Sequence, residues 1–315
     1  MKVENLFKVE SLTHMKDSFQ RADFKDSAAG IVLGVSLIAV DPEIFKKQFP
    51  KLTFVNSGIT VNNYGGFARY VESLRLTPQG GFVDADDLSS AKGKISLKGE
   101  NDLIKVYRKQ AFSEWTDTEI QEANLQNINL VSNFVETHNE LYLQMVDSIG
   151  YIGQNTNTGL LNNTYFGTGV ASGYYYNMTP LELYNTVAED TIVKQWNLVK
   201  NIVAYKANIV TMPIEMLNYL STQILNTTHG SATVLRALQD NFAGVKFTDT
   251  VYATTSMVAW STNRQSMQMR ITEPLTVGEI IKTGSFTYKM DSKFSIAGLD
   301  ILQKDAGYIL TGVAA

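Results

Sequence analysis

The sequence contains no cysteine and only three histidines, His14, His138 and His229. Without cysteine the chain forms no disulfide, no thiolate zinc site and no cysteine nucleophile. The histidines are far apart and belong to no His-x-x-x-His or Glu-x-x-His pattern, so nothing indicates a metal site. His138 falls on the apolar line of a predicted helix, where we expect a hydrogen-bonded, partly buried side chain. We therefore predict neither a metal nor a cofactor.

Long apolar runs and excess basic charge are missing as well. No apolar segment reaches about 18 residues, the length expected of a transmembrane helix, and residues 1–8 lack the apolar core of a signal peptide. The net charge is −4 and the pI about 5.5, whereas dedicated nucleic-acid-binding domains usually have a pI above about 9. We expect a chain made in the cytoplasm, without membrane contact and with at most weak, non-specific contact with DNA.

The usual signatures of catalysis are also absent. There is no Gly-x-Ser-x-Gly and no phosphate loop. Residues 167–173 match Gly-x-Gly-x-x-x-Gly only superficially, because they do not lie between a clear strand and a helix. The acidic stretch Asp84–Asp87 lacks the glycine and closing glutamate of a calcium loop, so we interpret it as a solvated turn. We predict no catalytic residue and no enzyme.

What the sequence does contain is a charged, β-rich stretch over residues 56–112. Tyr70–Leu76 alternates imperfectly, residues 78–81 mark a turn, and further strand-like segments follow from Ile95 to Arg108. Ordering backbone costs roughly 1–2 kcal/mol per residue, and such a hairpin buries little apolar area to offset this cost. The stretch is better explained if another subunit supplies the missing contacts.

A long helix is predicted from Thr116 to Gly150. Thr116 and Glu119 fit a capping box, and apolar residues then recur at steps of three and four, which indicates one buried face. Several asparagines between residues 124 and 133 are poor helix formers, so we expect packing rather than propensity to hold this helix. The turn Gly159–Asn162 follows it.

A mixed α+β unit is predicted over residues 179–254. A capping box begins at Thr179, a buried strand covers 207–212, and Pro213 opens a helix that ends near residue 225. Ser231 is the expected cap of the next helix, and residues 251–254 resemble a strand. From Met257 onwards the pattern is again typical of β-strands.

Two features remain open at this level. The most apolar run of the chain, Ile31–Val40, fits a buried strand or a helix equally well; we expect the region around it to be an arm. Among Tyr174, Tyr175 and Tyr176, some side chains are either exposed at an interface or packed half inward at a sheet edge.

The order of these parts resembles that of the major capsid proteins of tailed double-stranded DNA bacteriophages, which have the HK97-type fold. The closest likeness in a motif is Tyr151-Ile152-Gly153 followed by Gly159-Leu160-Leu161-Asn162, and Gly298–Ile301 is similar to the closing strand region. The matching parts are the N-terminal arm, the charged loop 66–109, the helix 116–150, the turn 159–162, the unit 179–254 and the returning strands 267–310.

The resemblance implies an α+β, HK97-like capsid fold with an N-terminal arm, an extended β-hairpin loop, a peripheral domain with a long spine helix, and an axial α+β domain. The corresponding ranges are 1–55 for the arm, 56–112 for the extended loop, 113–154 with 257–292 for the peripheral domain, and 155–256 with 293–315 for the axial domain.

The implied function is that of a structural subunit. Its copies would assemble as hexamers and pentamers into the icosahedral capsid shell that encloses the phage genome, so the protein would be part of the virion, assembled in the host cytoplasm. Because the arm is short, a separate scaffolding protein is expected, with the portal and decoration proteins as further partners. Nothing identifies a partner for a covalent crosslink, and none is predicted.

Basic residues of the extended loop are the candidate contacts between subunits, and we expect them to be sensitive to salt. Reversing the charge at Arg75 or Arg108 is expected to impair assembly and leave folding intact. An encapsulin-like compartment shell and an enzyme with an unrecognised α+β site are the alternative hypotheses. The candidate contact residues are Arg69, Arg75, Lys98, Lys105 and Arg108.

Overall fold

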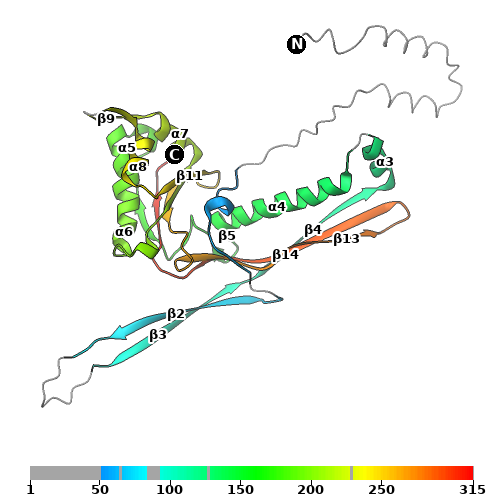
Figure 1. Ribbon diagram of the computed structural model, residues 1–315, viewed down its shortest axis with the longest axis horizontal. Coiled ribbons are helices and arrows are strands. Elements are labelled where there is room, and N and C mark those ends of the chain that lie inside the picture. Colours follow the sequence, from blue (N-terminus) through cyan, green and yellow to red (C-terminus); the bar gives the residue numbers. More distant parts are fainter. Residues whose placement is uncertain (1–50, 64–65, 84–92, 126–127, 228–229, 315) are drawn as a thin grey trace, which may run out of the picture.

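The computed structural model (Figure 1) describes residues 51–314 except for 64–65, 84–92, 126–127 and 228–229. The predictions made for residues 1–50 and for Asp84–Asp87 lie outside this part of the chain, as does His229. The described residues form two packed units and a projecting hairpin. Figure 1 shows the units side by side, with helix α4 along one and helices α5 to α8 in the other.

The first unit is a four-stranded sheet with a long helix lying along it. The strand order is β1-β13-β14-β4, with β1 parallel to β13 and the other pairs antiparallel. Its strands are β1 (Val61–Asn63), β4 (Tyr107–Thr116), β13 (Met267–Lys282) and β14 (Thr287–Ile301), and its helices are α3 (Asp117–Leu125) and α4 (Leu130–Ile152).

The helix predicted from Thr116 to Gly150 is two helices, so the prediction of one continuous helix was wrong. The capping box is present: the Thr116 amide donates to Glu119 Oε2 at 2.7 Å, and the Glu119 amide donates to Thr116 Oγ1 at 3.3 Å. A second start follows at Asn129, whose Oδ1 accepts the Ser132 amide at 3.1 Å. Asparagine is among the best N-caps and a poor interior residue, so its side chain favours a new start here.

The second unit is a five-stranded sheet covered by helices. The strand order is β11-β8-β12-β15-β7. Its strands are β7 (Gly167–Val170), β8 (Ile209–Pro213), β11 (Lys246–Thr250), β12 (Ser256–Trp260) and β15 (Gly307–Thr311). Its helices are α5 (Pro180–Val187), α6 (Lys194–Leu198), α7 (Ile214–Thr222) and α8 (Val234–Asn241), with a π-helical segment Ala188–Val193 joining α5 to α6.

The central strands of this sheet are buried on both faces. All five residues of β8 are buried, as expected for the continuous apolar run in the sequence. Alternate residues enter two different cores, so the sheet separates the helices α5 to α8 from the first unit. One core receives Val210, Met257 and Leu310, and the other receives Ile209, Val258 and Ile309.

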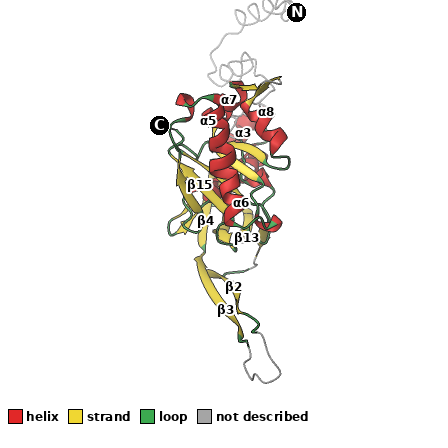
Figure 2. Ribbon diagram, turned by 90° about the vertical axis from the view of Figure 1, so that its left-hand side faces the viewer, coloured by secondary structure: helices red, strands yellow, loops and turns green. Residues whose placement is uncertain are grey.

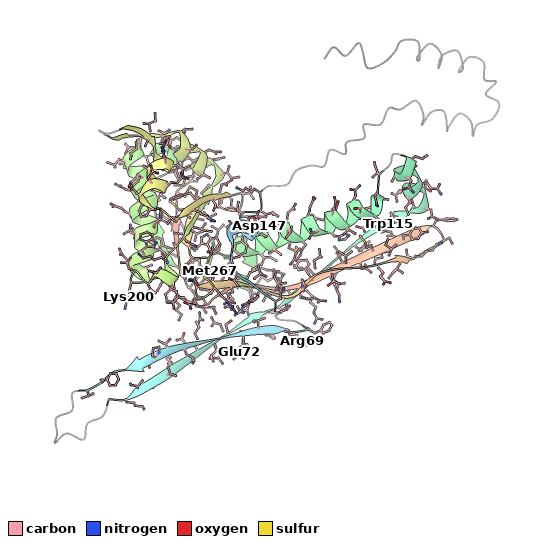
Figure 3. The ribbon with its side chains drawn as sticks, in the orientation of Figure 1. Arg69, Glu72, Trp115, Asp147, Lys200 and Met267 are labelled. Atoms are coloured by element: carbon pink, nitrogen blue, oxygen red, sulfur yellow. The ribbon has the colours of Figure 1, made fainter. Side chains whose placement is uncertain are left out.

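The first described residues of the chain cross the C-terminal end of α4. Phe54 packs edge-on against Tyr151 at 5.6 Å between ring centroids and stacks on Trp260 at 5.9 Å. A Cβ at Gly150 would lie 2.4 Å from the Phe54 ring, so only glycine allows this approach. Asp147 accepts the Phe54 amide at 2.8 Å, and Figure 3 places it near the junction of the two units.

Local predictions in the second unit were partly correct. The capping box at Thr179 and Glu182 is confirmed, and so are the buried strand and the helix that follows Pro213. The cap of α8 is Thr233, whose Oγ1 accepts the Arg236 amide, and not Ser231. The strand predicted at 251–254 was wrong: these residues form the bend between β11 and β12.

Small elements complete the described chain. Gly153, at φ +83°, ends α4 and begins a short hairpin whose two strands have two residues each. The turn Gly159–Asn162 closes the end of the same helix, since the Leu160 amide donates to the Gly150 carbonyl. These elements are β5 (Gly153–Gln154), β6 (Asn157–Thr158), β9 (Ile224–Thr227), β10 (Gly230–Thr233) and the 3-10 turns Val55–Ser57, Tyr175–Asn177 and Val203–Tyr205. Among the described residues, no helix has the length and apolar character needed to cross a membrane.

Candidate assembly surfaces

The charged stretch forms a two-stranded hairpin that leaves the body of the molecule. Strand β2 (Tyr70–Gly80) pairs antiparallel with β3 (Ile95–Lys105) over eleven residue pairs. Figure 2 shows the hairpin projecting away from both units. Within the range 56–112 that the sequence analysis assigned to the loop, residues 61–63 and 107–112 pair in the four-stranded sheet of the body as parts of β1 and β4.

One face of this hairpin carries most of its exposed apolar side chains, interspersed with Glu72, Asn101 and Lys105. The register sets Leu76 opposite Gly99, Pro78 opposite Leu97 and Gly80 opposite Ile95. Directly opposed residues of an antiparallel pair share a face, so the apolar side chains of both strands gather on one side. We call this set the apolar stripe; its members are 56–68 % exposed and comprise Tyr70, Leu74, Leu76, Ile95, Leu97 and Leu103. The stripe thus leaves a row of large apolar side chains without cover in the subunit.

The opposite face is polar and fixes the root of the hairpin to the body. Arg75 forms an ion pair with Asp102, donates to the Ile301 carbonyl at 2.8 Å and lies 4.9 Å from the ring centroid of Tyr165. Beside it, Lys304 donates to Glu100 at 3.2 Å, and this contact lowers the pKa of Glu100. The hairpin therefore leaves the body at an angle set by several polar contacts.

A buried ion pair lies beneath this root. Arg270 on β13 contacts Asp300 on β14 through Nη2 at 2.7 Å and Nε at 2.8 Å, and both side chains are at most 6 % exposed. Ser73 of β2 donates a hydrogen bond to the same Asp300 oxygen. Hydrogen bonds from several donors make such a burial of charge tolerable. Asp300 thus links two strands of the body to the hairpin.

The five predicted contact residues occupy different environments. Arg69 is exposed just before β2. Lys98 is exposed on the polar face, 3.5 Å from Glu100. Lys105 lies over the ring of Tyr107 at 5.3 Å, and Arg108 lies over that of Phe67 at 5.2 Å. These four cations remain candidates for contacts with another subunit.

Arg75 differs from the other four because its partners lie in its own subunit. Its side chain is 12 % exposed. The sequence analysis proposed it as a contact between subunits, whereas the structure turns its side of the hairpin toward the body. Reversing its charge is therefore expected to disturb the hairpin root as well as assembly.

His138 lies on α4 and connects the helix to the sheet. Its Nε2 is 2.7 Å from Ser113 Oγ on β4, and its Nδ1 is 2.7 Å from Ser292 Oγ on β14. The side chain is buried, as expected for a histidine with satisfied hydrogen bonds. Within the described ranges, no cluster of three or more histidine, aspartate or glutamate side chains is placed to hold a metal ion.

Two other motifs from the sequence also have structural roles. Residues 167–170 form strand β7, which pairs with β15, rather than a phosphate-binding turn. Tyr175 is buried and its hydroxyl donates to Glu215 at 3.2 Å. Tyr174 and Tyr176 are exposed and stack on each other, with 6.1 Å between ring centroids. The three tyrosines therefore combine both arrangements left open by the sequence.

Together the fold and these surfaces define a class of protein. A broken spine helix on a long sheet, an axial α+β unit and a projecting hairpin are the parts of the HK97-like capsid fold. Several solved structures share it. The chain is 40% identical to a chain from the capsid of Myoviridae Phage XM1, with a TM-score of 0.78, over 89% of this chain and 98% of that one.

More distant structures agree on the fold. A chain from Mycobacterium phage Che8 is 16% identical, with a TM-score of 0.61, over 88% of this chain and 97% of that one. A chain from the capsid of the native GTA particle is 11% identical, with a TM-score of 0.63, over 92% and 100%. Comparison with curated protein sequences finds no match.

The family model described as major capsid protein matches residues 84–313. The chain belongs to the major capsid protein family. It is a subunit of a phage capsid shell, a structural and not an enzymatic protein, and such subunits are part of the virion.

Proposed function

We propose that copies of this chain assemble as hexamers and pentamers into a closed icosahedral shell around double-stranded DNA, and that the hairpin 66–106 carries a principal contact between neighbours. The observation that supports this proposal is the apolar stripe, a set of large apolar side chains that no described part of the subunit covers. Monomeric proteins rarely expose contiguous apolar patches of this kind.

The stripe and the basic residues have different roles in this proposal. The apolar side chains supply most of the contact energy, because burial of apolar area is favourable in proportion to the area removed from water. Arg69, Lys98, Lys105 and Arg108 orient the approach of the neighbour and make assembly sensitive to salt.

The two packed units are assigned to the two domains expected of this fold. The four-stranded sheet with α3 and α4 forms the peripheral domain, and the five-stranded sheet with α5 to α8 forms the axial domain around the five- and six-fold axes. Assembly takes place in the host cytoplasm with a separate scaffolding protein, and the portal and decoration proteins complete the particle. Contact with DNA is weak, since the chain carries a net charge of −4.

The test compares two substitutions at neighbouring positions of β3. Leu97→Asp places a charge in the apolar stripe, whereas Ser96→Asp places the same charge on the opposite, polar face; both residues are exposed in the subunit. Leu97→Asp is expected to abolish closed shells in electron micrographs and sedimentation, because a buried, unpaired carboxylate is costly. Ser96→Asp is expected to assemble.

Folding of the separate subunit provides the control. Both positions lie towards the tip of the hairpin, so thermal melts of the two variants should match that of the natural sequence. If Leu97→Asp assembled as efficiently as Ser96→Asp, the stripe would not be an assembly contact.

A further inference from the structure

An apolar groove runs between α4 and strand β4 on the first unit. It has a volume of about 560 Å³. Its apolar lining consists of Phe112, Leu141, Tyr142, Met145, Leu275 and Phe294. Three of these side chains are markedly open to solvent, with Phe112 61 %, Leu141 49 % and Met145 38 % exposed. A groove of this composition is favourable for an apolar segment.

The groove also holds a polar atom that lacks a partner. The side-chain nitrogen of Gln144 is buried and makes no hydrogen bond among the described residues, while His138 at the groove is satisfied by Ser113 and Ser292. A buried donor without an acceptor is unfavourable.

The described chain begins at one end of this groove. The amides of Phe54 and Val55 donate to Asp147 Oδ1 at 2.8 and 3.2 Å, and the next residue of α4, Ser148, lines the groove. Figure 1 shows α4 extending from this entry point along the sheet. The start of the described chain therefore lies beside one end of the groove.

The preceding sequence contains a suitable occupant. Ile31–Val40 has no charged residue, and Ser36 is its only polar side chain. From Thr137 to Ser148 the groove follows about 17 Å of helix axis. The ten residues between Val40 and Lys51 span up to about 36 Å when extended, which is longer than the groove. Tethering also gives this segment a high effective concentration over any free competitor.

We propose that Ile31–Val40 of the same chain lies in the groove between α4 and β4 and covers Leu141, Met145 and Phe112. This contact fixes the N-terminal region to the peripheral domain of its own subunit. It is independent of the contact proposed for the hairpin, because the two surfaces lie on different elements.

The first test uses disulfide trapping in the full chain, which has no cysteine of its own. Leu141→Cys is combined in turn with Leu33→Cys, Val35→Cys and Leu37→Cys, and the pairs are oxidised in subunits and in shells. The expected result is an intramolecular disulfide for at least one pair, found in non-reducing gels as a fast-migrating monomer. The matched control is Asn139→Cys, an exposed position two residues away on the other face of α4, which should not form the disulfide.

The second test uses Met145 as an internal reporter. Every other methionine in the described part of the chain is at most 9 % exposed, so Met145 is the one expected to oxidise fastest if the groove is open. With the segment in place, oxidation should be roughly tenfold slower than in the variant Val35→Asp/Leu37→Asp, since the segment must first leave the groove. Met257 serves as the buried control in both proteins.

Three outcomes would overturn the proposal. Fast oxidation of Met145 in the natural sequence without any disulfide would mean an open groove. Intermolecular disulfides, found as dimers and longer ladders, would mean that the segment comes from another copy. Protection of Met145 without any disulfide to residues 33–37 would mean a different occupant, such as the hairpin of a neighbour.

Discussion

Replacement of Asp300 by alanine tests the structural basis of the hairpin root. Asp300 is 1 % exposed, forms the ion pair with Arg270 at 2.7 Å and accepts the hydroxyl of Ser73. The substitution removes the carboxylate and leaves the guanidinium buried without it. Because water cannot replace the lost carboxylate at this depth, the subunit must bear the cost of a desolvated charge.

The expected loss is large relative to the stability of a domain. Removing one partner of a buried ion pair costs about 3–5 kcal/mol, and domains are stable by about 5–15 kcal/mol. The Ser73 hydroxyl also loses its acceptor, which adds about 1 kcal/mol. Asp300→Ala should therefore lower the free energy of unfolding by about 4–6 kcal/mol.

Urea denaturation of the unassembled subunit measures this loss, and the same strand offers a matched control. Asp291 on β14 pairs with Lys289 at 2.8 Å, but its side chain is 56 % exposed. Asp291→Ala should cost less than about 1 kcal/mol, as exposed pairs do. The double variant Arg270→Met/Asp300→Leu should recover most of the stability, because apolar residues of similar size often replace a buried pair without loss.

A loss at Asp300→Ala within about 1 kcal/mol of that at Asp291→Ala would refute this reasoning. It would mean that the buried pair is compensated by relaxation or by water, and that the angle of the hairpin does not depend on it.

Two further predictions concern the entry of the chain across α4. Burial raises the pKa of Tyr151 from 10.0 to about 12. Because the tyrosine ionises at a lower pH in the unfolded chain, its contribution to stability is present below about pH 9 and is lost as the pH rises through 10 to 12. In urea titrations the natural protein should lose about 2 kcal/mol more stability than Tyr151→Phe between about pH 9 and 12. An equal loss in both proteins would contradict the assignment. Phe54→Ala should cost about 3–5 kcal/mol through the cavity left beside Trp260, measured by thermal melts; a loss below about 1 kcal/mol would mean that the neighbouring rings close the gap.

Much of the element order could be predicted from local signals. The capping boxes at Thr116 and Thr179, the buried strand at 209–213 and the strand from Met267 depend on short stretches of sequence. The break at Asn129 was missed because periodicity weighs apolar spacing, whereas the local preference of asparagine for a cap decided the structure. Ser231 was predicted to cap α8, whereas Thr233 does so. Both residue types are acceptable caps, and only the packed position of α8 selects one.

The candidate site could be predicted only in part. The sequence identified the charged stretch that forms the hairpin, together with its cations. The apolar stripe, however, depends on the register of β2 with β3, which sets Leu76 and Leu97 on one face. A shift by one residue would move every side chain of one strand to the other face. The role of Arg75 likewise depends on Asp102 and Ile301, and Ile301 is remote in sequence.

The sequence by itself determined that this chain has no cysteine chemistry and no catalytic motif, and it set the order of arm, hairpin, helix and α+β unit that points to the capsid family. These are properties of composition and of local pattern. Only the tertiary structure decided on which face of the hairpin its exposed apolar side chains gather, that Arg75 binds within its own subunit, and that Arg270, Asp300 and Ser73 meet beneath the root. Ser73 and Asp300 are 227 residues apart in the sequence, and no local periodicity encodes a partner at that separation.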